Sequence, residues 1–228
     1  MSTSYGFDLQ LDLDQTQLPG FIAVEGPIGV GKTTLAKHLA HTFNHQTLLE
    51  RADKNPFLER FYQEPHSAAL PLQLHFLFER SKQLENLRQN DLFSPNRVAD
   101  YLIDKDQLFA QVILDDDELR LYQKVYDMCV IDAPKPDLVI YLQASVQTLM
   151  ERIHQRGISS EQHLSEAYLT TLNDAYTRFF LYFNRSPLLI INTEDLDLVS
   201  NPDDYQHLVN YLLQIKSGRH YYNPPPKI

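Results

Sequence analysis

Apolar and polar residues follow two alternating patterns along the chain. Short apolar runs predict strands at residues 21–24, 47–50, 97–103, 138–143 and 187–192. Between them, apolar residues at helical spacing predict helices near residues 35–43, 55–62, 67–90, 107–131, 146–155, 165–183 and 203–215. Because parallel strands are usually joined by helices, this alternation predicts an α/β fold. We expect a three-layer sandwich in which a five-stranded parallel sheet carries helices on both faces.

The length and the two ends of the chain predict one domain over residues 20–216. A chain of 228 residues is close to the size of a single domain. Residues 1–19 form a polar leader that lacks the basic and apolar regions of a signal peptide. Residues 217–228 contain three consecutive prolines, which predict an extended tail beyond the last helix.

Composition and charge exclude several classes of protein. A hydrophobic fraction of 43% is enough for a packed core and excludes a wholly disordered chain. Thirty acidic against twenty basic residues leave a net charge of −10, so we expect no binding to nucleic acid. With one cysteine and no apolar run of 18 residues, we expect a cytoplasmic protein that is not bound to a membrane.

A phosphate-binding loop follows the first predicted strand. Its residues match the pattern G-x-x-x-x-G-K-[ST] and are Gly26, Pro27, Ile28, Gly29, Val30, Gly31, Lys32, Thr33 and Thr34. Backbone N–H groups of such a loop surround phosphates, Lys32 reaches the β- and γ-phosphates, and Thr33 can bind Mg²⁺. The loop predicts binding of a nucleoside triphosphate, but it leaves ATPases, nucleotide kinases and metabolite kinases open. The N-K-x-D segment of guanine-specific GTPases is absent from the sequence.

Further segments accompany the loop at fixed spacings. They are Glu50 after the second predicted strand, NPFLERFY at 55–62, QLHFLFER at 73–80, Phe109 with Ala110, PDLVIYL at 136–142 and ERIHQRG at 151–157. With these segments the chain resembles the deoxynucleoside kinase family over about residues 21–195. The resemblance implies a P-loop kinase fold with a lid near residues 156–165. It also implies that the protein uses ATP and Mg²⁺ to phosphorylate the 5′-hydroxyl of a deoxynucleoside, with purines mildly favoured. This reaction belongs to nucleotide salvage. We further expect a homodimer.

Glu50 and Lys32 are the first candidates for catalysis. A nucleoside hydroxyl is a poor nucleophile, so a carboxylate within hydrogen-bond reach must take its proton. Glu50 suits this task because it follows a strand end beside the phosphate loop. Arg152 and Arg156 lie one helical turn apart before a polar segment, as expected of lid arginines that close over transferring phosphates.

Other residues are candidates for binding the nucleoside. Gln73 and Arg80 are two helical turns apart and share one helix face, where they offer donors and an acceptor to a base edge. By the resemblance, Tyr62 contacts the sugar 3′-hydroxyl and Glu161 is its partner from the lid. The aromatic residues that then flank the base are Phe76 and Phe109.

The chain departs from the family pattern at two places. After the third strand the family has an acid followed by arginine and serine, whereas Tyr101 follows Asp100 here. Asp100 remains a candidate for holding Mg²⁺ together with Thr33. Lys105 either replaces the missing positive charge or lies near the base, and the sequence leaves both interpretations open. A lid position that is often arginine in the family is Ile158.

Two other functions stay open at this point. A nucleoside monophosphate kinase of the thymidylate kinase kind shares the loop and the lid, and Arg51 could bind the phosphate of its acceptor. A noncatalytic nucleotide-binding partner subunit is the alternative outside the enzymes, because two family arginines are missing. The presence of Glu50, Lys32, Asp100 and Glu161 argues against that second alternative.

Overall fold

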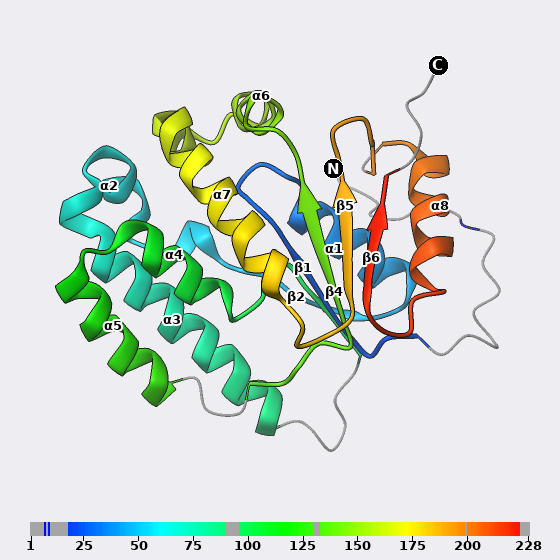
Figure 1. The fold of residues 1–228 in the computed structure, drawn as a ribbon, viewed down its shortest axis with the longest axis horizontal. Helices are drawn as coiled ribbons and strands as arrows, with labels where there is room; N and C mark the ends of the chain where they lie inside the picture. The colour runs from blue at the N-terminus through cyan, green and yellow to red at the C-terminus, as the bar shows by residue number, and fades with distance from the viewer. Residues whose placement is uncertain are drawn as a thin grey trace.

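The computed structural model describes residues 7, 9, 18–89, 96–129, 133–198 and 200–223. At its centre lies a parallel sheet of six strands in the order β2-β3-β1-β4-β5-β6 (Figure 1). The strands are β1 (Phe21–Glu25), β2 (Gln46–Leu48), β3 (Arg97–Ala99), β4 (Leu138–Gln143), β5 (Leu188–Asn192) and β6 (Arg219–Tyr222). The α/β sandwich with a parallel sheet is therefore confirmed.

The expected number of strands was wrong, because β6 adds a sixth. It lies in the segment that we expected to be an extended tail, and it pairs in parallel with β5, with Leu188 opposite Arg219 and Ile191 opposite Tyr222. The sequence RHYY lacks the aliphatic run that marks the buried strands, so it gave no strand signal. The three prolines of the tail, at 224–226, and most of the leader lie outside the described residues.

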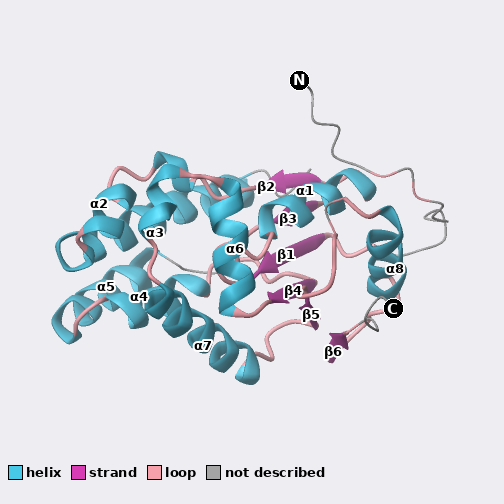
Figure 2. Ribbon diagram, turned by 90° about the horizontal axis from the view of Figure 1, so that it is seen from above, coloured by secondary structure: helices cyan, strands magenta, loops and turns pink. Residues whose placement is uncertain are grey.

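Helices cover both faces of the sheet (Figure 2). On one face, α1 (Lys32–Thr42) and α8 (Pro202–Leu212) bury Leu39 and Leu208 in a cluster with Ile22 and Ile140 of the sheet. On the other face, α4 (Lys105–Ile113) and α7 (Glu166–Tyr182) contribute a second cluster. Strands buried on both faces favour apolar residues at consecutive positions, which explains why β1 is apolar up to Val24 and β4 up to Leu142.

Three of the remaining helices extend the molecule to one side of the sheet: α2 (Leu58–Gln63), α3 (Pro65–Gln89) and α5 (Asp116–Cys129). α3 packs against α2, α4 and α5 (Figure 1). The helix α6 (Val146–Arg156) lies above the carboxyl end of β4, and two short 3₁₀ turns, η1 (Ala52–Lys54) and η3 (Ser159–His163), complete the described structure. No helix in the described part of the chain is both long enough and apolar enough to cross a membrane.

The single helix expected over residues 107–131 is two helices, α4 and α5. They separate at Asp115, whose carboxylate accepts hydrogen bonds from the backbone N–H groups of Asp117 and Glu118, both at 2.9 Å. The Glu118 carboxylate in turn accepts from the N–H of Asp115. This reciprocal capping begins a new helix, and the sequence D-x-x-E was its signal.

Candidate active site

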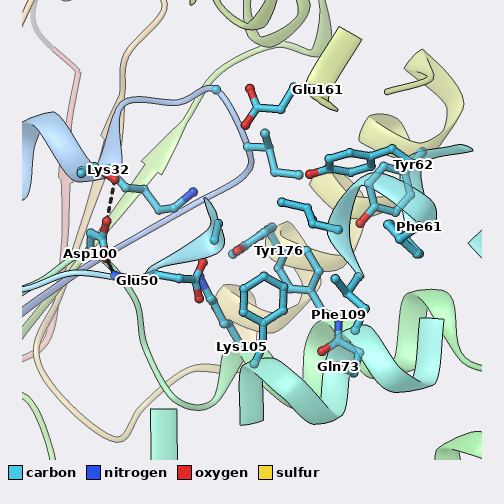
Figure 3. Close-up of a pocket in the computed structure, with 18 of the residues that line it drawn as sticks. Lys32, Glu50, Phe61, Tyr62, Gln73, Asp100, Lys105, Phe109, Glu161 and Tyr176 are labelled. Carbon is cyan, nitrogen blue, oxygen red and sulfur yellow. Dashed lines mark hydrogen bonds and ion pairs between the residues drawn. The ribbon is translucent and has the colours of Figure 1, made fainter. Parts of the chain in front are cut away.

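A pocket of about 170 Å³ opens beside the phosphate loop, between the sheet and the helices α2, α3, α4 and α7 (Figure 3). We call it the central pocket. It brings together most of the residues selected from the sequence: Ile28, Gly29, Lys32, Thr33, Glu50, Tyr62, Gln73, Phe76, Arg80, Asp100, Lys105, Phe109, Arg156 and Glu161. These residues come from segments across the chain, as expected for a ligand site at the carboxyl ends of parallel strands.

The phosphate loop joins β1 to α1 and depends on its glycines. Gly26 and Gly29 have φ values of 149° and 87°, a region that other residues rarely adopt. A Cβ atom on Gly26 would lie 2.5 Å from the carbonyl oxygen of Leu142. The ammonium of Lys32 folds over the loop and donates to the carbonyl oxygens of Gly26 at 2.7 Å and Pro27 at 2.9 Å. The glycines and the Lys32 contacts thus fix the shape of the loop.

Asp100 connects three elements at the edge of the loop. Its Oδ2 accepts a hydrogen bond from the Thr33 hydroxyl at 2.5 Å, and its Oδ1 accepts from the backbone N–H of Glu50 at 2.8 Å. Asp100 follows β3, Thr33 lies in the first turn of α1, and Glu50 follows β2. The contact with Asp100 thus fixes the backbone of Glu50 relative to the phosphate loop.

The Glu50 carboxylate lies between two cations. Arg80 donates to Oε1 through Nε at 2.9 Å and also through a terminal nitrogen, and Lys105 donates to Oε2 at 3.1 Å. Burial alone would raise the pKa of Glu50, but the charges of Arg80 and Lys105 outweigh it and lower the pKa to about 2. Glu50 is therefore ionised throughout the neutral pH range.

Arg80 has a second carboxylate partner, Asp106, which the sequence analysis missed. The other terminal nitrogen of Arg80 donates to Asp106, whose side chain is fully buried on α4. Burial raises the pKa of Asp106 to about 6, although Arg80 opposes this shift. Because Glu50 and Asp106 hold Arg80 from two sides, this arginine positions Glu50 and has fewer donors left for a base than we expected.

Gln73 and two phenylalanines form the far end of the central pocket. Gln73 is 2% exposed, and its Oε1 is buried without a hydrogen-bond partner. The ring of Phe76 lies 5.0 Å from the Arg80 guanidinium, and Phe109 meets Tyr176 edge to face at 6.1 Å. A buried amide oxygen without a partner is costly, so this end of the pocket is suited to a flat ligand that donates a hydrogen bond.

The segment expected to act as a lid lies against α2. Arg156 donates to Glu161 at 2.5 Å, and both side chains line the central pocket. Tyr62 of α2 lines the same part of the pocket, and burial together with the nearby charge of Glu161 raises the pKa of its hydroxyl. Arg156 and Glu161 of the lid segment and Tyr62 of α2 thus line the same part of the central pocket.

Comparison with known proteins agrees with this geometry. The family model for deoxynucleoside kinases matches residues 22–215. The chain belongs to the deoxynucleoside kinase family. It is 34% identical over 200 residues to a deoxyguanosine kinase of Bacillus subtilis, covering 86% of this chain and 97% of the relative. A deoxyadenosine/deoxycytidine kinase of Bacillus subtilis is 31% identical over 204 residues, covering 85% and 92%.

A solved structure supports the same family. A deoxyadenosine kinase from M. mycoides with the products dCMP and dCDP bound has a TM-score of 0.74 at 27% identity, and the match covers 86% of this chain and 100% of that chain. Family membership makes this chain a deoxynucleoside kinase, an enzyme that transfers phosphoryl groups.

Arg152 of this deoxynucleoside kinase is not in the central pocket. It donates to the hydroxyl of Thr193 at 3.0 Å and to the Thr193 carbonyl at 2.6 Å. There it lines a second cavity of about 330 Å³ on the other side of the phosphate loop, together with Gly31 and Gln155. The two arginines expected to close over the same phosphates thus face different cavities.

Glu25 is a second buried acid that the sequence analysis missed. Its Oε1 accepts from the Gly26 N–H and from the Tyr176 hydroxyl, both at 2.9 Å, and its Oε2 accepts from the Leu102 N–H at 2.8 Å. The kinase uses this one carboxylate to join the phosphate loop, the segment after β3 and α7. An acid as the last residue of an apolar strand was the available signal.

Proposed function

We propose that the protein transfers the γ-phosphoryl group of ATP to the 5′-hydroxyl of a purine deoxynucleoside. The position of Glu50 supports this most strongly, because its ionised carboxylate lies between the phosphate loop and the end of the pocket formed by Gln73. Its relatives include a deoxyguanosine kinase and a deoxyadenosine kinase, which supports the preference for purines. The products are ADP and a deoxynucleoside monophosphate, which places the reaction in nucleotide salvage.

Glu50 is the general base of the reaction. It accepts the hydrogen bond of the 5′-hydroxyl and takes its proton as O5′ bonds to the γ-phosphorus and the bond from that phosphorus to ADP breaks. Its low pKa keeps the carboxylate ionised at neutral pH, so it can accept the proton as the new bond to phosphorus forms. Lys32 and Arg156 offset the charge of the phosphates, Lys32 from the loop and Arg156 from the lid at residues 156–165.

Thr33 and Asp100 are the residues that would hold Mg²⁺. Their oxygens already lie 2.5 Å apart beside the loop, and a hydroxyl with a carboxylate is the oxygen donor set that Mg²⁺ prefers. Within the described residues there is no group of three or more acidic, histidine or cysteine side chains that could hold a metal alone. An ion held by these two residues would complete its coordination with phosphate and water, and it would neutralise charge on the triphosphate.

The second cavity receives the base of ATP in this proposal. It adjoins the phosphate loop at Val30 and Gly31, opposite the central pocket, and Arg152 lies along it. Two hydrogen bonds fix the guanidinium of Arg152 to Thr193, and a planar guanidinium can stack on an aromatic base. Arg152 therefore acts on the donor nucleotide, whereas Arg156 acts on the transferring group.

We further propose that the enzyme is a cytoplasmic homodimer. Three large apolar side chains are exposed on the neighbouring helices α3 and α5: Phe78, Leu121 and Met128. Large apolar side chains exposed on two adjacent helices favour a surface that binds another protein chain. Light scattering should give twice the mass of one chain, and the mass of a single chain would contradict the proposal.

The monophosphate kinase alternative is not favoured. Arg51, the residue that could bind an acceptor phosphate, is exposed to solvent and does not line the central pocket. The noncatalytic alternative is not favoured either, because the named relatives are kinases. A panel assay with Mg²⁺-ATP and each deoxynucleoside, ribonucleoside and monophosphate tests the proposed function. We expect the highest kcat/KM with a purine deoxynucleoside, and preference for a monophosphate acceptor would overturn the proposal.

Replacing Gln73 with alanine is expected to raise the KM for the nucleoside at least about tenfold. The base loses a buried hydrogen-bond partner, which costs roughly 1–3 kcal/mol. The KM for ATP should change little, because Gln73 lies at the end of the pocket away from the phosphate loop. Gln147→Ala, at an exposed position on α6, is the matched control. Equal changes in both KM values would show that Gln73 has only a structural role.

Replacing Tyr62 with phenylalanine is expected to weaken discrimination at the sugar 3′ position. Its hydroxyl is the group next to Glu161 that can bond the 3′-hydroxyl, so kcat/KM for the normal substrate should fall several-fold while that for a 3′-deoxy analogue stays nearly constant. Tyr182→Phe, at a side chain that is 79% exposed, serves as the control. Similar losses for both nucleosides would contradict the contact.

A further inference from the structure

Lys105 is a buried cation whose ammonium has more N–H groups than hydrogen-bond partners. The residue is 2% exposed at the start of α4, and its ammonium donates one hydrogen bond, to Glu50 Oε2 at 3.1 Å. The ring of Tyr101 lies 5.9 Å from the ammonium, and no other polar partner of Lys105 occurs in the described part of the chain. An ammonium has three N–H groups, and burying unused donors is costly. Because Lys105 lines the central pocket, those donors are available to a ligand there.

The ammonium of Lys105 belongs to the phosphate end of the pocket. Figure 3 shows Lys105 beside Glu50, on the side of Lys32 and Asp100, whereas Gln73 lies farther along the pocket. Burial lowers the pKa of Lys32 to about 8, and the charge of Lys105 adds to that shift. Because the ammonium groups of Lys32 and Lys105 repel each other, an anion bound between them would be stabilised by both.

The ring of Tyr101 lies close to both cations that contact Glu50. Its ring lies 5.6 Å from the Arg80 guanidinium and 5.9 Å from the Lys105 ammonium, and its hydroxyl donates to Gln83 at 2.5 Å. The aromatic face thus supports both cations while adding no charge of its own. Arg80 donates to Oε1 of Glu50, and Lys105 is the cation that donates to Oε2.

We propose that Lys105 is a catalytic residue that contacts the phosphoryl group during transfer and remains bound to the phosphate of the monophosphate product. This inference rests on the proposed function. As the γ-phosphorus bonds to O5′ and separates from ADP, the proton of the 5′-hydroxyl passes to Glu50. The protonated Glu50 attracts Lys105 less, and at the same moment the dianionic phosphate of the product comes to lie beside the Lys105 ammonium. Lys105 then donates to the phosphate instead of to Glu50.

The test compares binding of a deoxynucleoside and of its 5′-monophosphate to Lys105→Met by calorimetry. Methionine keeps the length of the side chain and removes the charge. We expect the monophosphate to bind at least about tenfold more weakly, the nucleoside to change less than about threefold, and kcat to fall at least about tenfold. Lys105→Arg should keep monophosphate binding within a few-fold, and Lys124→Met, at an exposed position on α5, should leave all three values unchanged.

Two results would overturn the inference. Equal weakening of nucleoside and monophosphate, with a changed order of preference among bases, would place Lys105 at the base. Unchanged monophosphate binding would exclude a phosphate contact. If Lys105→Met does not fold, Lys105→Gln gives the same comparison while keeping a donor for Glu50. The binding readout needs no turnover, so a wild-type protein that phosphorylates no nucleoside would contradict the proposed function without deciding the role of Lys105.

Discussion

Glu50→Gln is expected to lower kcat by about 10²–10⁴-fold, because an amide keeps the shape of the carboxylate but cannot take the proton of the 5′-hydroxyl. Nucleoside binding measured by calorimetry should stay within a few-fold of the wild type. Arg80 keeps its second partner, Asp106, so the buried guanidinium is not left without a counter-charge. The melting temperature, measured alongside, separates loss of chemistry from loss of structure.

Glu59→Gln is the matched control for this substitution, since Glu59 is an exposed acid on α2. It should have wild-type kcat and wild-type stability. An unchanged kcat in Glu50→Gln would remove Glu50 from the role of base.

Lys32→Ala is expected to lower kcat/KM for ATP by about 10²–10³-fold or more. The ammonium is the charged group closest to the phosphate loop, and removing one preorganised donor to developing charge has effects of this size. Both ATP binding and transfer should suffer, because the same charge attracts the triphosphate in the ground state and in the transition state.

Lys82→Ala provides the comparison for Lys32→Ala, because Lys82 is exposed on α3 and lies outside the central pocket. Its kinetics should match the wild type at every ATP concentration. Wild-type activity in Lys32→Ala would refute the function of the loop as a phosphate site. A raised KM for ATP with an unchanged kcat would limit Lys32 to binding.

The parts of the fold that could be predicted are those in which local sequence and burial agree. β4 is six consecutive buried or nearly buried positions, so its run of apolar residues fixed its bounds at residues 138–143. β6 has no such run, because it is an edge strand held by backbone pairing to β5. The break between α4 and α5 depends on the capping box at Asp115 and Glu118, a signal that apolar periodicity ignores.

Some residues of the candidate site could be predicted from the sequence and others could not. Lys32, Glu50 and Gln73 belong to local motifs, and the structure brings them into one pocket. Asp106 and Glu25 could not be found from such motifs, because their partners lie on other segments, Arg80 on α3 for Asp106 and Tyr176 on α7 for Glu25. Side chains that act through long-range contacts become visible only when the chain is folded.

The two lid arginines show the limit of spacing arguments. Arg152 and Arg156 are four residues apart on α6, and helical geometry alone predicts a shared face. In the structure, Arg152 donates a hydrogen bond to Thr193 and lines the second cavity, whereas Arg156 donates to Glu161 and lines the central pocket. The loop lies between them, so a single helix face serves two cavities.

Phosphorus NMR of the reaction products is the most direct test of the central claim that this site phosphorylates the 5′-hydroxyl of a deoxynucleoside. The protein is incubated with Mg²⁺-ATP and deoxyadenosine or deoxyguanosine, with the 5′-deoxy analogue of each as control. We expect one equivalent of ADP for each 5′-monophosphate formed, and no transfer to the 5′-deoxy analogue. ADP released without a nucleotide product, or phosphate found at another position of the sugar, would contradict the account.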